Sequence, residues 1–211
     1  MEGVVEILAQ QWQQQSMAEV FAVLFSIAYV WLAAEESIWC WPAALISTTL
    51  FVYVYWDVSL VFQMLLNAYY VVMAVVGFMH WKKTNASGFS ALNMPLKLHL
   101  LIVIGGAFML LLTVLIAQQW LAYELLYLDA GTTLFSLLAT YLTVKKYLQS
   151  WVYWSVINAL TIYLLLETQL YLTVVLMALY IVIAVRGYLN WSISMQTSEV
   201  IDNSAQTVGL K

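Results

Sequence analysis

Long apolar segments, separated by short polar breaks, fill most of this sequence. Seven segments have about 17 to 25 residues each, which is the length a helix needs to cross about 30 Å of hydrocarbon. They cover residues 17–35, 38–56, 58–81, 98–118, 126–147, 150–166 and 169–191. The pattern therefore predicts an all-α polytopic membrane protein with seven transmembrane helices.

The short breaks sort these spans into two groups of three. Only a few residues separate successive spans within a group, so its helices are expected to be antiparallel neighbours, and span 98–118 stands between the groups. When the sequence is shifted by 110 residues against itself, the two groups align without a gap. The pairs least expected by chance are Trp41/Trp151, Tyr53/Tyr163, Tyr70/Tyr180, Gly77/Gly187 and Trp81/Trp191. The alignment predicts two parallel three-helix repeats, because a single linker helix gives both groups the same orientation.

These boundaries divide the chain into five parts. Residues 1–16 form an N-terminal segment that suits an amphipathic helix on the membrane surface. Residues 17–81 form the first three-helix bundle, 82–125 a loop and the linker helix, and 126–191 the second bundle. Residues 192–211 lack apolar periodicity, so a disordered cytoplasmic tail is expected there.

Composition supports a membrane protein and excludes other classes. The chain is 64% hydrophobic and 9% charged, with a mean hydropathy of +0.88, far outside the range of soluble domains. A net charge of −4 and the absence of any lysine or arginine run argue against nucleic acid as a partner. The single cysteine, Cys40, has no partner for an internal disulfide and no companions for a metal site, so it is expected in the apolar core.

Basic residues near the span ends gather on one side of the predicted topology. They are Lys82, Lys83, Lys97, Lys145, Lys146 and Arg186, whereas Asp57, Glu124, Asp129 and Glu167 fall on the other side. Basic loops face the cytoplasm, so the N-terminus is expected outside and the C-terminus inside. Arg186 is expected to extend to the inner headgroups. Trp81, Trp120 and Trp191, near span ends, are expected in the interfacial aromatic belt.

The first candidates for a binding site lie in the sixth span. Polar groups in hydrocarbon are costly and tend to face a bundle interior or a cavity. Trp151, Trp154 and Asn158, spaced by three and four residues, share one helix face. Asn158 lies roughly 10 Å deeper than Trp151 and cannot reach water, whereas Trp151 is equally consistent with the aromatic belt. In the repeat, Trp154 and Asn158 align with Ala44 and Thr48, so the halves diverge where one asymmetric ligand would be recognised.

A second group of candidates lies in the third span. Asn67 stands near its middle, with Gln63 and Tyr70 one turn away on the same side. An amide at this depth either contacts a ligand or links two helices by a hydrogen bond.

Four further candidates are Ser26, Ser136, Thr133 and Asp129. The two serines occupy equivalent places in the repeat, and their alternative role is to let helices approach closely. Gly105 and Gly106 in the fourth span are expected to serve such close packing as well. Asp129 belongs, with Asp57 and Glu167, to an acidic group that either attracts cations to the outer mouth or is simply solvated.

Missing residue types exclude several activities. No Asp, Glu, Lys or His occupies the middle of a span, so the carboxylate relay of a proton-coupled pump is missing. The last span has no lysine for a retinal Schiff base, and the spans hold no deep Ser/His or carboxylate pair for a protease. The sequence therefore predicts no enzyme, no cofactor and no metal. A membrane protein that binds its ligand without transporting it stays open as an alternative.

The stretch "LDAGTTLFSLLATYLTVKKYLQSWVYWSVIN", residues 128–158, resembles the PnuC family of vitamin transporters, which is related in fold to the sugar-transporting SWEETs. The shared features are an Asp that opens the fifth span, a Ser within it, a basic close, and a W-x-x-W followed by Asn. Gly77 and Trp81 extend the likeness to the third span, and the whole covers about residues 19–191. One departure is Asn67, where family members often have Gln.

This resemblance implies a carrier of the bacterial inner membrane. The family takes up nicotinamide riboside by facilitated diffusion, and a cytoplasmic kinase then phosphorylates the substrate and traps it. Relatives carry thiamine, riboflavin or deoxynucleosides, and a homotrimer is implied. Trp151 and Trp154 would stack on a flat cationic ring, and Asn158 and Asn67 would hydrogen-bond its carboxamide or ribose. The expectation is a passive nicotinamide riboside carrier, with thiamine as the alternative substrate.

Overall fold

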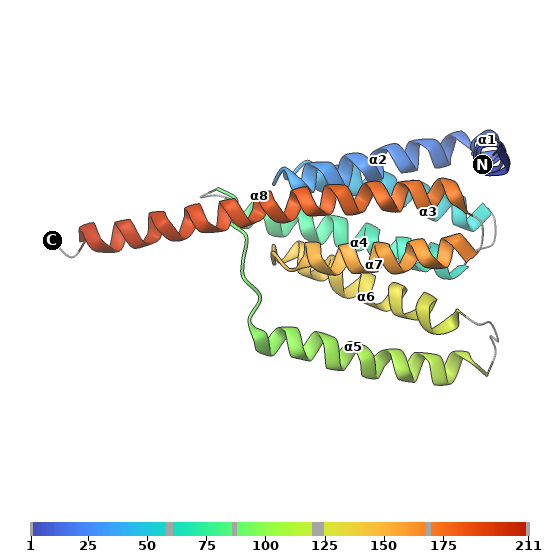
Figure 1. Ribbon diagram of the computed structural model, residues 1–211. Coiled ribbons are helices and arrows are strands. Elements are labelled where there is room, and N and C mark those ends of the chain that lie inside the picture. Colours follow the sequence, from blue (N-terminus) through green and yellow to red (C-terminus); the bar gives the residue numbers. More distant parts are fainter. Residues whose placement is uncertain (1, 58–60, 86–87, 120–124, 168–169, 210–211) are drawn as a thin grey trace.

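A computed structural model describes residues 2–57, 61–85, 88–119, 125–167 and 170–209. Within these ranges the chain folds into eight helices, which confirms the all-helical prediction. They are α1 (Glu2–Gln14), α2 (Met17–Ala34), α3 (Cys40–Asp57), α4 (Val61–Thr84), α5 (Leu96–Ala117), α6 (Leu126–Val144), α7 (Ser150–Glu167) and α8 (Tyr171–Gly209). Figure 1 shows α2 to α4 and α6 to α8 packed into one bundle, with α5 along one side. We call α2, α3 and α4 the first triplet and α6, α7 and α8 the second.

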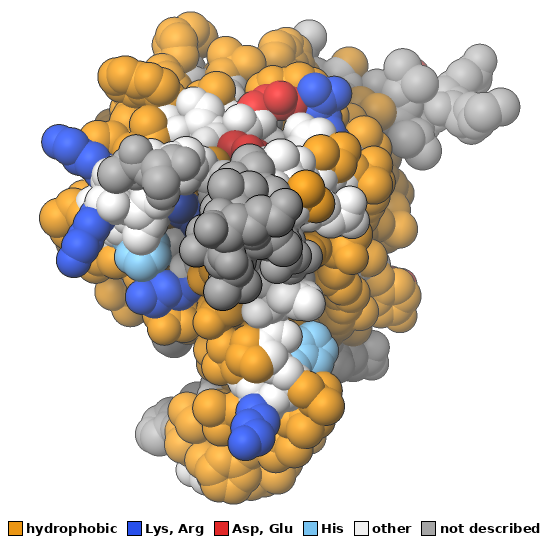
Figure 2. Space-filling view, turned by 90° about the vertical axis from the view of Figure 1, so that its left-hand side faces the viewer, with side chains coloured by type: hydrophobic (Ala, Val, Ile, Leu, Met, Phe, Trp, Pro, Cys, Tyr) orange, Lys and Arg blue, Asp and Glu red, His pale blue; other side chains and the backbone are white. Residues whose placement is uncertain are grey.

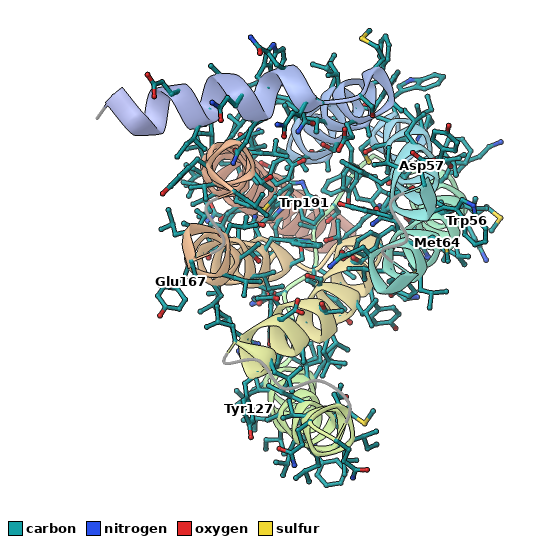
Figure 3. The ribbon with its side chains drawn as sticks, turned by 90° about the vertical axis from the view of Figure 1, so that its right-hand side faces the viewer. Trp56, Asp57, Met64, Tyr127, Glu167 and Trp191 are labelled. Carbon is teal, nitrogen blue, oxygen red and sulfur yellow. The ribbon has the colours of Figure 1, made fainter. Side chains whose placement is uncertain are left out.

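The short helix α1 lies across one end of the bundle (Figures 1 and 3). The side-chain oxygen of Gln11 accepts a hydrogen bond of 3.1 Å from the backbone N–H of Leu172 at the start of α8. A capping box then starts α2, because Ser16 and Glu19 bond each other's backbone N–H groups. This placement is consistent with a helix on the membrane surface.

The last helix is much longer than the predicted seventh span. It continues to Gly209 and projects beyond the bundle, whereas a disordered tail was expected from Ser192 onward (Figure 1). No Pro or Gly occurs between Gly187 and Gly209, so no residue in this stretch is a strong helix breaker. Asn190 and Ser194 are also bonded to the turn after α2, which anchors the first part of the extension.

Among the described residues, four helices are long and apolar enough to cross a membrane by length and composition. These are Met17–Ala34, Gln63–Thr84, Leu96–Ala117 and Tyr171–Ser198. Helices α3, α6 and α7 carry more Ser, Thr, Trp and Tyr, which lowers their hydropathy. The chain is therefore a membrane protein with several strongly apolar helices and three helices of mixed character.

Tryptophan and glycine form the same contact in both triplets. Trp41 of α3 lies on Gly77 of α4, and Trp151 of α7 lies on Gly187 of α8, with 110 residues between the equivalent positions. A Cβ atom at either glycine would stand 2.5 Å from the indole, well inside contact distance. The helices of each pair therefore approach closely because the glycine has no side chain.

Four tryptophans form a buried aromatic core where the triplets meet. The ring centroids of Trp41 and Trp81 are 5.3 Å apart at 89°, and those of Trp151 and Trp191 are 5.3 Å apart at 83°. Trp81 and Trp191 contact each other at 5.8 Å, and both are fully buried. The prediction that Trp81 and Trp191 lie in the interfacial belt is thus wrong, because both are buried where the two triplets contact each other, a boundary that we call the seam. Trp120, the third belt candidate, falls outside the described residues.

The long helix α5 packs mainly on α6, contacts α7 through His99 and Tyr153, and turns apolar side chains outward (Figure 1). Gly106 faces α6, where a Cβ atom would stand 2.8 Å from the Phe135 ring, so this glycine does allow close packing. Gly105 has nothing within 4 Å of its Cβ position. The close contact expected at Gly105 is therefore not present in this part of the chain.

Basic side chains lie together at one end of the bundle (Figure 2). We call it the basic end, where α2, α4 and α6 finish and α3, α5 and α7 begin. Arg186 was expected to reach lipid headgroups, but its Nε lies 2.6 Å from the Glu35 carboxylate and its guanidinium stacks 4.6 Å from the Trp31 ring centre. Arg186 therefore joins α8 to α2.

The linker between the triplets is fastened to the basic end. The backbone N–H of Leu92 donates to the carbonyl of Lys146, and that of Leu148 donates to the carbonyl of Leu92, both at 2.9 Å. Phe89 lies between Trp81 and Trp191, with ring centres 5.1 and 5.0 Å away. The linker is thus part of the structure that closes this end.

Candidate functional site

A cavity of about 70 Å³ lies between the two triplets. Its lining residues come from five helices: Tyr29, Trp41, Ala44, Thr48, Tyr70, Ala74, Thr140 and Trp154. Most of the wall is aromatic or apolar, with hydroxyl groups from threonine and tyrosine. Such a wall suits a flat ring with a few polar substituents.

The cavity exists because equivalent positions of the two triplets carry side chains of different size. Trp154 lines it from the second triplet, whereas the residue 110 positions earlier is Ala44, which lines it from the first. One turn further along, Thr48 and Asn158 form the next unequal pair. Two indoles at the first pair would fill the space that alanine leaves open, so divergence between the halves creates the cavity.

The indole of Trp154 is held in place by α6. Its Nε1 donates to the Thr143 hydroxyl oxygen at 3.1 Å, and that hydroxyl donates in turn to the Ala139 carbonyl at 3.0 Å. A side chain fixed in this way loses little further entropy when a ring stacks on it. Trp154 is therefore a preorganised wall.

Buried hydroxyl groups follow one face of α6 along its length. Thr132, Ser136, Thr140 and Thr143 are all buried, and each donates to a carbonyl three or four residues earlier in the helix. Thr140 reaches the cavity wall. Their spacing of three and four residues is readable in the sequence, although Ser136 alone of the four is among the predicted site residues.

The two predicted serines connect the triplets at equivalent positions. The hydroxyls of Ser26 on α2 and Tyr180 on α8 lie 2.5 Å apart, and the Tyr70 hydroxyl on α4 interacts with Ser136 on α6. Ser26 and Ser136 are 110 positions apart, as are Tyr70 and Tyr180. In each pair the serine belongs to one triplet and the tyrosine to the other. Ser26 and Ser136 therefore join the triplets, and of these four residues only Tyr70 lines the cavity.

The predicted amides have different surroundings. Asn67 is buried, and its side-chain nitrogen donates to the carbonyl of Gln63 at 2.9 Å within α4, so it links no second helix by this bond. Asn158 is also buried, 6% exposed, one turn from Trp154 on α7. Because Asn158 lies one turn from Trp154, which lines the cavity, it is the stronger candidate for ligand contact.

The remaining predicted site residues lie away from the cavity. Trp151 packs on Gly187 and Trp191 in the aromatic core and does not line the cavity. Thr133 is half-buried on α6, and Asp129 lies in the first turn of α6, opposite the basic end. Figure 3 shows Asp57 and Glu167 on separate flanks of that opposite end, where both are exposed, while Glu124 falls outside the described residues.

Of the residues that line the cavity, only Tyr70 and Trp154 were among the predicted site residues. Tyr29 lines the cavity from α2, and Thr143 fixes the Trp154 indole. A tyrosine in the middle of an apolar span signals a buried hydroxyl, but only the helix packing shows which helix it faces. Thr143 belongs to the three-and-four-residue stripe on α6, which was the available signal.

Geometry and chemistry together define the class of this protein. It is an all-helical membrane protein with a cavity between its two triplets, and the cavity has aromatic walls and neutral polar groups. No cluster of three or more His, Cys, Asp or Glu that could hold a metal occurs among the residues the structure describes.

The comparisons with known proteins agree with this class. The chain belongs to the nicotinamide mononucleotide transporter family, whose family model matches residues 16–193. It is 32% identical over 162 residues to the nicotinamide riboside transporter PnuC of Neisseria mucosa, an alignment that covers 70% of this chain and 61% of that protein. The family and this relative are transporters and not enzymes.

A solved structure supports the fold. The crystal structure of the vitamin B3 transporter PnuC superposes with a TM-score of 0.72 over 92% of this chain and 90% of the other, at 24% identity. The likeness at this identity concerns the fold alone. The chain thus has the fold of a PnuC membrane transporter, and its alignment with the curated relative spans about 61% of the relative's length.

Proposed function

We propose that this chain is a passive carrier that takes up nicotinamide riboside across a bacterial inner membrane. The observation that carries the proposal is the aromatic cavity between the triplets, with the Trp154 indole fixed by Thr143 as one wall. The family and the name of the Neisseria relative supply the substrate. A SWEET-like arrangement of the repeats is part of the proposal.

The chemistry of the cavity suits a flat cationic ring that carries a sugar. An indole face attracts a cation with about 0.5 to 2 kcal/mol, and the nicotinamide ring of the riboside is positively charged. The Asn158 amide can donate and accept hydrogen bonds, as a carboxamide or ribose hydroxyl requires. Thiamine, also a flat cation, is the alternative substrate.

Binding requires the triplets to move apart. Pockets for small organic ligands measure about 300 Å³ or more, and the cavity here measures about 70 Å³. We therefore assign this structure to a closed form without room for substrate. The seven helices α2 to α8 act as two parallel repeats and one linker helix, and one triplet rocks against the other to expose the site alternately on each side.

Orientation and energetics complete the proposal. The basic end faces the cytoplasm and α1 lies on the outer surface, so the N-terminus is outside and the C-terminus inside. No Asp, Glu, Lys or His stands in the middle of a span to couple transport to protons, so the substrate gradient drives uptake. A cytoplasmic kinase then removes the free substrate. The assembly of three copies stays a prediction.

Flux into vesicles containing only the purified protein tests this function. Radiolabelled nicotinamide riboside is expected to enter until inside and outside concentrations are equal, with or without a proton or sodium gradient. Accumulation above the outside concentration under a gradient contradicts the passive mechanism. Binding without flux identifies a non-transporting binding protein, and uptake of thiamine in preference to the riboside identifies the alternative substrate.

A further inference from the structure

At the basic end the two triplets are joined by a pair of hydrogen bonds that run in opposite directions. The Nε1 of Trp81 in the first triplet donates to the carbonyl of Val144 in the second at 3.0 Å. The Nε1 of Trp191 in the second triplet donates to the carbonyl of Ala33 in the first at 2.9 Å. Each bond links the third helix of one triplet to the end of the first helix of the other, so both flanks of the seam are closed.

Glu36 and Lys146 occupy equivalent positions in these two flanks. Each is the second residue after the first helix of its triplet, and their numbers differ by 110. Their φ angles are 61° and 60°, and no other non-glycine residue has a positive φ in the described ranges. This left-handed conformation favours glycine and costs other residues about 1 kcal/mol or more. Both positions nevertheless hold a long charged side chain.

Each of these two side chains reaches the opposite triplet. The Lys146 ammonium donates to the side-chain oxygen of Asn85, which follows α4. The Ser194 hydroxyl of α8 donates to the Glu36 carboxylate. Asn85 and Ser194 lie four and three residues beyond the paired tryptophans Trp81 and Trp191. The four polar residues therefore form two matching links across the seam, which we call the interlock.

The interlock carries opposite charges and has one buried member. Lys146 is only 4% exposed, whereas Glu36, Asn85 and Ser194 are half-buried. The Lys146 Nζ lies 4.8 Å from the Phe89 ring centre and 5.8 Å from that of Trp81. Burial lowers the pKa of Lys146 to about 8, and the attraction of Glu36 opposes this shift. Burial likewise raises the pKa of Glu36, while Ser194 and Lys146 counteract it. The same charge at both positions would repel, whereas the pair observed attracts across the seam.

We propose that the interlock of Glu36, Lys146, Asn85 and Ser194 is the latch that holds the two triplets closed at the basic end. The inference rests on the proposed function, because a carrier must open at this end to release its substrate. Both links have to break before the triplets separate, and the buried aromatic core then becomes accessible to water. Removing either charge is expected to shift the protein toward an opening at the basic end.

The chain contains a natural reporter of such opening. Cys40 is its single cysteine, is fully buried, and belongs to the same core cluster as Trp81 and Trp191. A small charged thiol reagent, 2-(trimethylammonium)ethyl methanethiosulfonate, should modify Cys40 in the purified full-length protein only when the seam opens. The labelling rate therefore measures the open population without reference to substrate.

Two charge-removing variants and one matched control test the latch. Lys146→Met and Glu36→Gln are each expected to raise the Cys40 labelling rate about tenfold, the effect of losing one charge-assisted hydrogen bond. Lys145→Met removes a neighbouring positive charge that lies over the Tyr141 ring instead of the seam, and should leave the rate unchanged. The double variant Glu36→Lys, Lys146→Glu should return the rate toward that of the wild type.

Unchanged labelling in Lys146→Met and Glu36→Gln overturns the proposal, as does an equal increase in Lys145→Met. If those variants do not fold, Ser194→Ala and Asn85→Ala retain both charges and remove only the partners, and unchanged labelling in both then overturns it. The proposed function fails separately. Absence of riboside uptake by the wild type refutes the carrier but leaves the labelling pattern intact, whereas normal uptake with uniform labelling refutes only the latch.

Discussion

Replacing Trp154 with leucine removes the indole wall of the cavity while keeping an apolar side chain. Stacking of a heteroaromatic ring on an aromatic side chain contributes about 1 to 3 kcal/mol. At about 1.4 kcal/mol per factor of ten, the dissociation constant for nicotinamide riboside should rise about 5- to 150-fold. The estimate applies in full only because the Thr143 hydrogen bond already holds the indole in place.

Two neighbouring variants separate this wall from the scaffold. Thr143→Val keeps the indole but removes its hydrogen bond, a loss of about 0.5 to 1.5 kcal/mol that weakens binding by at most about tenfold. Trp151→Leu empties the space beside Gly187 and Trp191, so it should lower the unfolding temperature and leave the affinity of the folded protein unchanged.

Isothermal titration calorimetry of the purified protein in detergent measures the affinities, with size-exclusion chromatography as the check on folding. The expected order of dissociation constants is wild type and Trp151→Leu together, then Thr143→Val, then Trp154→Leu. The reasoning is refuted if Trp154→Leu binds like the wild type, or if Trp151→Leu loses as much affinity as Trp154→Leu.

Three further outcomes follow from the geometry. Asn158→Leu should weaken riboside binding at least about tenfold while the protein stays folded, because leucine suits a buried position but offers the ligand no hydrogen bond; unchanged affinity in calorimetry removes it from the site. Gly77→Ala and Gly187→Ala should each destabilise by about 1 to 3 kcal/mol because a methyl group meets an indole, whereas Gly105→Ala should be neutral or stabilising in thermal unfolding. Ser26→Ala should lower the unfolding temperature but leave the dissociation constant unchanged in the same titration, because its bond to Tyr180 joins helices.

The fold was largely predictable because membrane helices leave a strong hydrophobic signal. The predicted starts of the spans at residues 17, 126 and 150 coincide with the first residues of α2, α6 and α7. The end of α8 was not predictable in this way, because hydropathy indicates which residues suit the membrane and not where a helix ends. Polar residues after Ser192 continue the helix as readily as apolar ones.

The roles of the tryptophans were only partly predictable. Position near a span end suggested the aromatic belt for Trp81 and Trp191, yet both are buried and donate to carbonyls of the opposite triplet. Sequence position gives the depth of a residue but not the direction in which it points. Pairing with glycine four residues earlier, Gly77 and Gly187, was the available hint that these helix ends pack closely.

The duplication is the most informative feature for function when its differences are considered together with its identities. Trp41 and Trp151 are identical, and each packs against a glycine of the next helix. Identical residues 110 positions apart therefore belong to the helix packing of the scaffold. Ala44 and Trp154 differ, and this difference opens the cavity. A perfectly symmetric bundle would present the same groups to both sides of a bound molecule, which suits no asymmetric ligand. A ring with a sugar on one side requires unequal walls. Differences between the two halves at a few positions supply such walls, while the residues that the halves share keep the packing that holds them together.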